Sequence, residues 1–246
     1  MRQSLLSALI AAPVFLAACV GPSSVSNGPL EPTQPLPPDY FPLVKGAEYK
    51  AKTYTYYFPD SESGEFTGYE LTRVMLVDRS GDTATASFRA VTLSKEEKQV
   101  GSPVETRYSL KGGGLYQAHG GGEPMKQMDW PPLEGSYVLP ASYVLDDFLR
   151  KNYEFSDISK TVTVGNSVTT EAGTFHDVIL VTSISTDTYL GSTPTRTSTT
   201  SHRVWLAPNV GMVKGRTDKE TQLTLGPSYS SSGFELATFS IPVVNP

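Results

Sequence analysis

Cysteine and histidine are scarce in this 246-residue chain. The single cysteine is Cys19, so no disulfide can form within the chain, and one soft ligand does not make a zinc or iron–sulfur site. The three histidines are His119, His176 and His202, and no two of them have the spacing of a His-Glu-x-x-His centre. We therefore expect no metal, no cofactor and a fold held by its own hydrophobic core.

Long apolar runs and basic clusters are also absent. The longest apolar stretch, residues 5–16, is interrupted once and spans about twelve residues, whereas a bilayer-spanning helix needs roughly 20. The chain has 20 Lys and Arg against 25 Asp and Glu, and its basic residues are scattered. This acidic balance argues against nucleic acid as a partner, and the lack of a polybasic run argues against electrostatic attachment to a membrane.

The first eighteen residues have the order of a secretory signal. Arg2 is their only charged residue, the apolar run follows it, and small residues end the segment. The segment closes on Leu16-Ala17-Ala18-Cys19, which resembles the lipobox of bacterial lipoproteins at all four positions. The resemblance implies that residues 1–18 are removed and that Cys19 becomes the lipid-modified first residue. The alternative is an ordinary secretory signal followed by a chance cysteine.

We accordingly expect the mature chain in the bacterial cell envelope, held to a membrane by acyl chains on Cys19. Val20 rather than Asp follows Cys19, which favours the outer membrane if the organism has one with enteric-type sorting. Residues 19–38 contain six prolines and few large apolar side chains, so they predict an extended tether of up to roughly 60 Å at about 3.1 Å per residue. Residues 39–246 are then one β-rich domain.

Apolar and polar residues alternate with period two through this domain, and turn residues recur about every ten positions. The pattern predicts a mainly β fold, an antiparallel sheet that forms a sandwich or an open half-barrel, with at most one or two short helices. The one helical spacing covers residues 141–152. The expected strands are residues 48–58, 69–78, 82–92, 105–110, 161–170, 174–185, 199–206, 212–225 (interrupted) and 234–241.

Three short segments resemble motifs of uncharacterised bacterial lipoproteins and periplasmic proteins. They are Tyr40-Phe41-Pro42-Leu43 with Gly46, then Glu171-Ala172-Gly173-Thr174-Phe175 leading into Val178-Ile179-Leu180-Val181, then Trp205-Leu206-Ala207-Pro208-Asn209-Val210-Gly211-Met212-Val213-Lys214. The resemblance covers roughly 30 residues, implies a mostly antiparallel β domain and supplies no catalytic residues. Independently of it, Gly173 and residues 208–211 fit the tight turns of two β-hairpins.

A search for catalytic patterns finds little. No Gly-x-Ser-x-Gly elbow and no phosphate loop occur in the sequence. His119 lies between two glycine triplets, with Glu123 and Asp129 downstream, which fits either a site or, more simply, a loop or strand bends. His176 and Asp177 are adjacent in an expected strand and point to opposite faces, so we interpret His176 as a surface residue. The sequence assigns no catalytic and no ligand-binding residue.

Three classes of function remain open. The first is a non-enzymatic envelope domain that binds a protein or a glycan, which the missing catalytic pattern favours. The second is a carrier of lipid or another apolar ligand inside a curved sheet, and the third, least favoured, is a hydrolase with an unrecognised site. The tyrosines at positions 49, 54, 56 and 57 fit either a ligand groove or a sheet core. An apolar cavity of a few hundred cubic ångströms inside the sheet would favour the carrier.

Overall fold

The computed structural model describes residues 40, 43–57, 61–81, 83–119, 124–130, 132, 134–139, 153–191, 196–223 and 226–243. Cys19, the expected signal and tether, and the expected helix at residues 141–152 lie outside these residues. Thirteen antiparallel strands form one sheet, which confirms the predicted mainly β fold. No helix occurs among the described residues, and hence none that is long and apolar enough to cross a membrane.

The strands follow the chain as a meander. Their bounds are β1 Glu48–Tyr56, β2 Glu65–Ser80, β3 Thr83–Leu93, β4 Val104–Lys111, β5 Gly114–His119, β6 Met125–Asp129, β7 Gly135–Leu139, β8 Tyr153–Phe155, β9 Ile158–Thr170, β10 Gly173–Tyr189, β11 Arg196–Ala207, β12 Gly211–Leu223 and β13 Gly226–Ser240.

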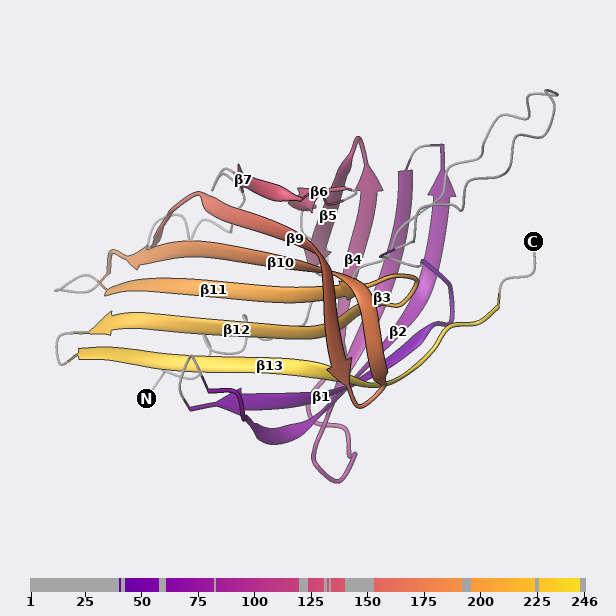
Figure 1. Ribbon diagram of the computed structural model, residues 1–246, viewed down its shortest axis with the longest axis horizontal. Helices are drawn as coiled ribbons and strands as arrows, with labels where there is room; N and C mark the ends of the chain where they lie inside the picture. Colours follow the sequence, from indigo (N-terminus) through magenta and orange to yellow (C-terminus); the bar gives the residue numbers. More distant parts are fainter. Residues whose placement is uncertain are drawn as a thin grey trace.

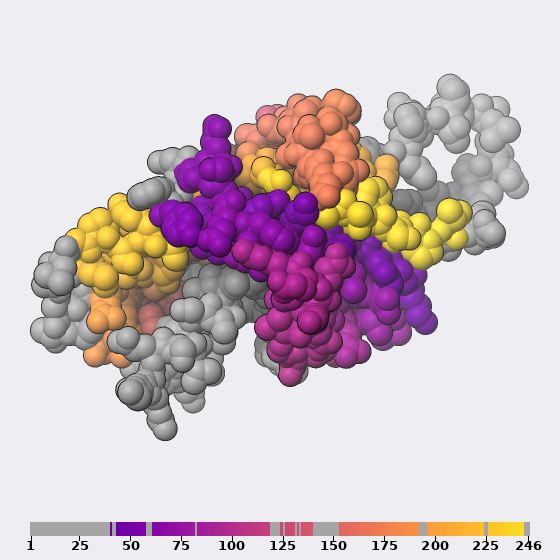
Figure 2. Space-filling model, turned by 90° about the horizontal axis from the view of Figure 1, so that it is seen from below, coloured from indigo at the N-terminus to yellow at the C-terminus, as the bar shows by residue number. Residues whose placement is uncertain are grey.

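The first and last strands pair with each other in the middle of the sheet. The strand order is β6-β5-β4-β3-β2-β1-β13-β12-β11-β10-β9-β7, with β8 paired to β10. The two ends of this order, β6 and β7, are consecutive in the chain. The sheet is therefore a nearly closed barrel whose opening lies between β6 and β7. In Figure 1, β9–β13 run crosswise to β2–β5, and in Figure 2 the indigo N-terminal strands lie against the yellow C-terminal ones.

The turns behave as their residues predict. Gly81 has φ +54° in the turn between β2 and β3, and Gly173 has φ +137° where β9 turns into β10. Asn209 and Gly211 have φ of 58° and 94° in the turn between β11 and β12. Glycine and asparagine tolerate positive φ better than other residues, so these residues fix where the chain reverses.

The inner face of the curved sheet holds one continuous core. Its fully buried members include Leu115, Leu206, Met212, Leu236 and Val74, and Phe88 packs edge-on against Tyr108 with ring centroids 5.2 Å apart. The burial pattern of β10 departs from strict alternation, because Val178 and Ile179 are both buried beside a bulge. β10 lies between β9 and β11, as expected for a strand with apolar residues on both faces.

Several strands extend further than the sequence predicts. β10 runs on to Tyr189, β13 begins at Gly226 instead of Phe234, and β12 is continuous where an interruption was expected. The four short strands β5, β6, β7 and β8 were not predicted at all. These segments have only three to six residues, too short for a clear period-two pattern, although Leu115, Met128 and Leu139 are buried.

Candidate functional site

A row of polar side chains crosses the inner face of the sheet. The register pairs each member with its neighbour on the next strand, and directly paired residues point to the same face. From β1 to β9 the row is Thr55, Ser232, Thr217, His202, Ser183 and Lys160. The adjoining inner row, two residues along each strand, is Thr53, Phe234, Gly215, Val204, Val181 and Val162. The polar row therefore borders the hydrophobic core directly.

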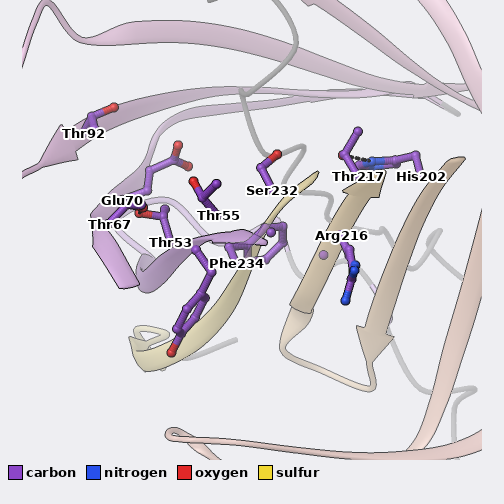
Figure 3. Close-up of a pocket in the computed structure, with 13 residues that line it drawn as sticks. Thr53, Thr55, Thr67, Glu70, Thr92, His202, Arg216, Thr217, Ser232 and Phe234 are labelled. Atoms are coloured by element: carbon purple, nitrogen blue, oxygen red, sulfur yellow. Dashed lines mark hydrogen bonds between the residues drawn. The ribbon is translucent and has the colours of Figure 1, made fainter. Parts of the chain in front are cut away.

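A pocket of about 280 Å³ lies on the β1, β2 and β13 side of this row. Six of its lining residues carry Ser or Thr hydroxyls, and Glu70, His202 and Phe234 line it as well; the hydroxyl residues are Thr53, Thr55, Thr67, Thr92, Thr217 and Ser232. In Figure 3 the hydroxyls, Glu70 and His202 lie on one side of the strands, whereas the Arg216 side chain points to the other. Arg216 thus lines the pocket from the backbone side only.

The pocket hydroxyls are only partly used by the protein itself. Thr53 Oγ1 lies 3.0 Å from Thr67 Oγ1, and Thr217 Oγ1 lies 2.7 Å from His202 Nδ1. The hydroxyls of Thr55, Thr92 and Ser232 make no hydrogen bond to another described residue. Each hydroxyl has one donor and two acceptor positions, so much of the hydrogen-bonding capacity of the pocket remains open to a ligand.

Glu70 is a buried acid in the pocket wall. It lies on β2 opposite Ala51 of β1 and Thr92 of β3, and 6% of it is exposed. Burial raises the pKa of its carboxyl to about 8, although the hydrogen bond donated by Thr72 Oγ1 at 3.1 Å acts in the opposite direction. At neutral pH the carboxyl is mostly protonated, so it can both donate and accept a hydrogen bond.

Lys160 and His202 are the two titratable members of the inner row. Lys160 is 7% exposed, and its Nζ donates to Ser183 Oγ at 2.7 Å. Burial lowers the pKa of Lys160 to about 8. Burial, and then the positive charge of Lys160, lower the pKa of His202 to about 4, so His202 is neutral at neutral pH.

Two glycines let aromatic rings lie flat on the sheet at the pocket. A Cβ on Gly215 would come within 2.2 Å of the Phe234 ring on the inner face, and a Cβ on Gly233 would come within 3.1 Å of the Tyr56 ring on the outer face. Phe234 is buried and forms the apolar wall of the pocket. Gly215 therefore sets the depth of the pocket, because any side chain there would displace the Phe234 ring.

The outer face behind the pocket is braced by an ion network. Asp218 accepts hydrogen bonds from Ser231 at 2.5 Å, Arg203 at 2.6 Å and Arg216 at 2.9 Å. Burial opposes ionisation of Asp218, but these three donors hold the pKa of its carboxyl below the usual value. Arg216 also lies 4.1 Å from the Tyr56 ring centroid and donates to the carbonyl of Ser61. These contacts fix β11, β12 and β13, which carry half of the polar row.

The structure separates the residues that the sequence singled out. His202 lies in the pocket, whereas His176 is exposed near the opposite end of β10, with its Nδ1 3.1 Å from Ser167 Oγ. Seven residues at about 3.3 Å each place these two histidines roughly 20 Å apart along the strands. Asp177 has φ 54° within a bulge, so the strict alternation expected for His176 and Asp177 was wrong, although His176 is a surface residue as predicted.

His119 is the last residue of β5 and pairs with Thr106, so it belongs to a strand and not to a loop. The preceding Gly112 and Gly113 form the turn between β4 and β5, with φ of 53° and 68°. The four tyrosines singled out in the sequence lie in different places: Tyr49 is in the core, Tyr54 lines the pocket, Tyr56 packs on the outer face, and Tyr57 is exposed. Within the described part of the chain, no three His, Cys, Asp or Glu side chains group as metal ligands.

The sequence missed Glu70 and Lys160. For Glu70 the available signal was a polar residue in the inward phase of the predicted strand 69–78, four residues before the buried Val74. Lys160 lies one residue before the predicted strand 161–170 and two before the buried Val162. Recognising it requires knowing which face of β2 and β9 is inward. That knowledge comes from partner strands far away in the chain.

The sequence and the structure were compared with those of known proteins. No family model matches the sequence, and no curated protein matches it. The chain is similar in structure to a "putative lipoprotein" from Parabacteroides distasonis, with a TM-score of 0.50, 15% identity, and coverage of 82% of this chain and 98% of that one. A "putative exported protein with YmcC-like fold" from Bacteroides fragilis gives a TM-score of 0.47 and 14% identity over 80% of this chain and 96% of that one. At this identity, the first likeness shows a shared fold.

Proposed function

We propose that this chain is a lipid-anchored lipoprotein of the bacterial envelope whose curved sheet binds a small polyhydroxylated ligand, of the saccharide class, in its inner pocket without converting it. The observation that carries the proposal is the lining of that pocket. It combines six hydroxyl side chains, a protonated carboxyl, a neutral histidine and one aromatic wall. Hydroxyl-bearing ligands match donors and acceptors of this kind, and the Phe234 ring supplies an apolar face for a sugar ring.

The size and surroundings of the pocket favour a small polar ligand over a lipid. The pocket volume of about 280 Å³ is just below the usual range for ligand pockets, roughly 300–1,000 Å³. The apolar part of the inner face is already filled by the continuous core around Leu206 and Leu236. An acyl chain in the pocket would leave buried hydroxyls without partners, at a cost of about 1–3 kcal/mol for each one.

We also propose that the protein binds its ligand without changing it chemically. Among the described lining residues, the hydroxyl held by a histidine is that of Thr217, and the pKa of His202, about 4, is too low for a general base at neutral pH. Backbone N–H groups along β11, β12 and β13 are engaged in the sheet ladder, so they do not form an oxyanion hole.

The anchor rests on the N-terminal sequence. The four residues 16–19 resemble a lipobox, and no alternative attachment is evident in the sequence. A structurally similar protein that bears the name lipoprotein is consistent with this address. Acyl chains contribute about 0.8 kcal/mol for each buried CH₂, so two or three chains on Cys19 hold the protein to a membrane.

Saturation-transfer NMR on the full-length chain in lauryldimethylamine oxide, a detergent without sugar, tests the pocket. We expect glucose, galactose or their disaccharides to give transfer, and Ser232→Ala to weaken binding by about five- to tenfold. Ser240→Ala on the same strand is the matched control, because Ser240 is exposed and lies outside the pocket. Lipid retained one-to-one in native mass spectrometry, with no sugar binding, would replace this proposal with the carrier function.

A further inference from the structure

Lys160 is a buried cation that the described residues leave without a counter-ion. It lies on β9 between Tyr137 of β7 and Ser183 of β10. Ser183 Oγ, at 2.7 Å, accepts one of its hydrogen bonds, whereas an ammonium group has three donors. No described carboxylate lies within ion-pair distance of its Nζ. Lys219, on the same inner face, is in contrast paired with Asp187 at 3.3 Å.

An uncompensated buried ammonium is unfavourable for folding. Apolar residues of similar volume at such positions are often neutral or stabilising, and the adjacent inward position on β9 is indeed Val162. Among the described residues, the titratable groups beside Lys160 do not neutralise it: His202 is uncharged at neutral pH, and burial raises the pKa of Tyr137 to about 12. The charge therefore fits a partner that arrives with the ligand.

Lys160 and the pocket are joined by the polar row itself. Ser183 and His202 are the next two members of the row, and His202 lines the pocket. Strands lie about 4.8 Å apart, so two strand spacings separate the backbones of Lys160 and His202. A lysine side chain that extends over Ser183 covers much of that distance. A negative group placed beside His202 would thus meet the Lys160 ammonium or a hydrogen-bond relay through Ser183.

We propose that the ligand of the inner pocket carries an acidic group, a carboxylate or a phosphate, and that Lys160 with Ser183 receives it. This inference rests on the proposed function and narrows its ligand to acidic saccharides, such as uronic acids or sugar phosphates. The rest of the pocket is suited to the neutral part of such a ligand, because Glu70 is protonated and adds no repelling charge.

The test compares glucose, glucuronate, glucose 6-phosphate and inorganic phosphate on the full-length chain in the same detergent. We expect one of the acidic sugars to bind at least tenfold more tightly than glucose, and this preference to shrink to within about twofold in Lys160→Met. Glucose binding itself stays unchanged. Lys45→Met is the control, because Lys45 is exposed and remote from the row. Which acidic sugar shows the preference distinguishes a carboxylate from a phosphate.

A second measurement does not depend on a variant that folds. The ¹³Cε resonance of Lys160 should titrate at a higher pH when the acidic sugar is bound than with glucose or no sugar, since an anion stabilises the ammonium. Equal binding of glucose and the acidic sugars, with an unmoved Lys160 titration, overturns this inference and leaves the saccharide pocket intact. Binding of inorganic phosphate through Lys160 without any sugar keeps the anion site and overturns the saccharide class. No binding of any probe overturns both.

Discussion

Three titratable groups on the inner face, the buried Glu70 and Lys160 and the partly buried His202, make the stability of the protein depend on pH. In the folded state, burial raises the pKa of Glu70 from 4.5 to about 8 and lowers that of Lys160 from 10.5 to about 8. Burial, and then Lys160, lower the pKa of His202 from 6.5 to about 4. Each unit of difference between folded and unfolded states corresponds to about 1.4 kcal/mol.

The signs follow from which state binds more protons. Folded Glu70 keeps a proton that the unfolded chain releases above 4.5, so its contribution is complete below 4.5 and is lost as pH rises to about 8, by roughly 5 kcal/mol at most. Folded His202 releases its proton early, so its contribution is gained between about 4 and 6.5, by roughly 3 kcal/mol. Folded Lys160 also releases its proton early, so its contribution to stability is gained as pH rises from about 8 to 10.5.

Summed over the three groups, the free energy of unfolding should be nearly flat from pH 4.5 to 6.5, fall by about 2 kcal/mol towards pH 8, and rise again above it. Glu70→Gln should remove the fall in the free energy of unfolding between pH 6.5 and 8. In that variant, stability should increase by about 3 kcal/mol up to pH 6.5 and then stay level to pH 8. Glutamine keeps a donor and an acceptor, so the two proteins should be similar near pH 5.

Urea denaturation followed by fluorescence of the two tryptophans, at half-unit steps from pH 4.5 to 9.5, measures these curves. Glu105→Gln removes one exposed carboxyl and should follow the wild-type curve within about 0.5 kcal/mol. If Glu70→Gln and the wild type decline in parallel between pH 6.5 and 8, the burial argument for Glu70 is wrong.

Three further predictions concern the pocket wall, its brace and the anchor. Gly215→Ala should lower the free energy of unfolding by about 1–3 kcal/mol in chemical denaturation, because the added Cβ meets the Phe234 ring. Combining it with Phe234→Leu should relieve part of this loss. If the losses of the two single variants simply add in the double variant, the proposed contact is wrong. Asp218→Asn should cost about 3–5 kcal/mol because two guanidinium groups lose their carboxylate, and a melting temperature within 2 °C of the wild type would refute it. Cys19→Ser should abolish palmitate labelling and release the chain from membranes, whereas unlabelled protein that still sediments after a high-salt wash would place the anchor elsewhere.

The fold was predictable where packing is one-sided and apolar. β3 alternates between core and more exposed positions from Thr83 to Phe88, and the turns at Gly81 and Asn209 follow from their residue types. The polar start of β13 was not predictable, since residues 226–233 are mostly of types that favour turns. They form a strand because they pair with β12. Local propensity is weak in such segments, and tertiary pairing decides.

The candidate site was less accessible than the fold. His202 was visible as one of three histidines, but its role depends on Thr217 and on a register that joins segments of β11 and β12. Glu70 lies in a strand where Leu71 and Val74 point to opposite faces. Either face could therefore be the apolar one, and the sequence alone does not decide which is inward. The pairing of Glu70 with Ala51 settles it, and that pairing is non-local.

The pocket depends on the most distant pairing in the sheet. The polar row begins at Thr55 on β1 and continues at Ser232 on β13, so the two ends of the chain must meet before the pocket exists. Such non-local contacts form slowly and are entropically expensive. A ligand that binds only the paired state stabilises it, by about 2.7 kcal/mol at a concentration one hundred times its Kd. Ligand binding and the closure of β1 on β13 are therefore thermodynamically linked, and the ligand should protect the amide protons of these two strands from exchange more than those of β4 and β5.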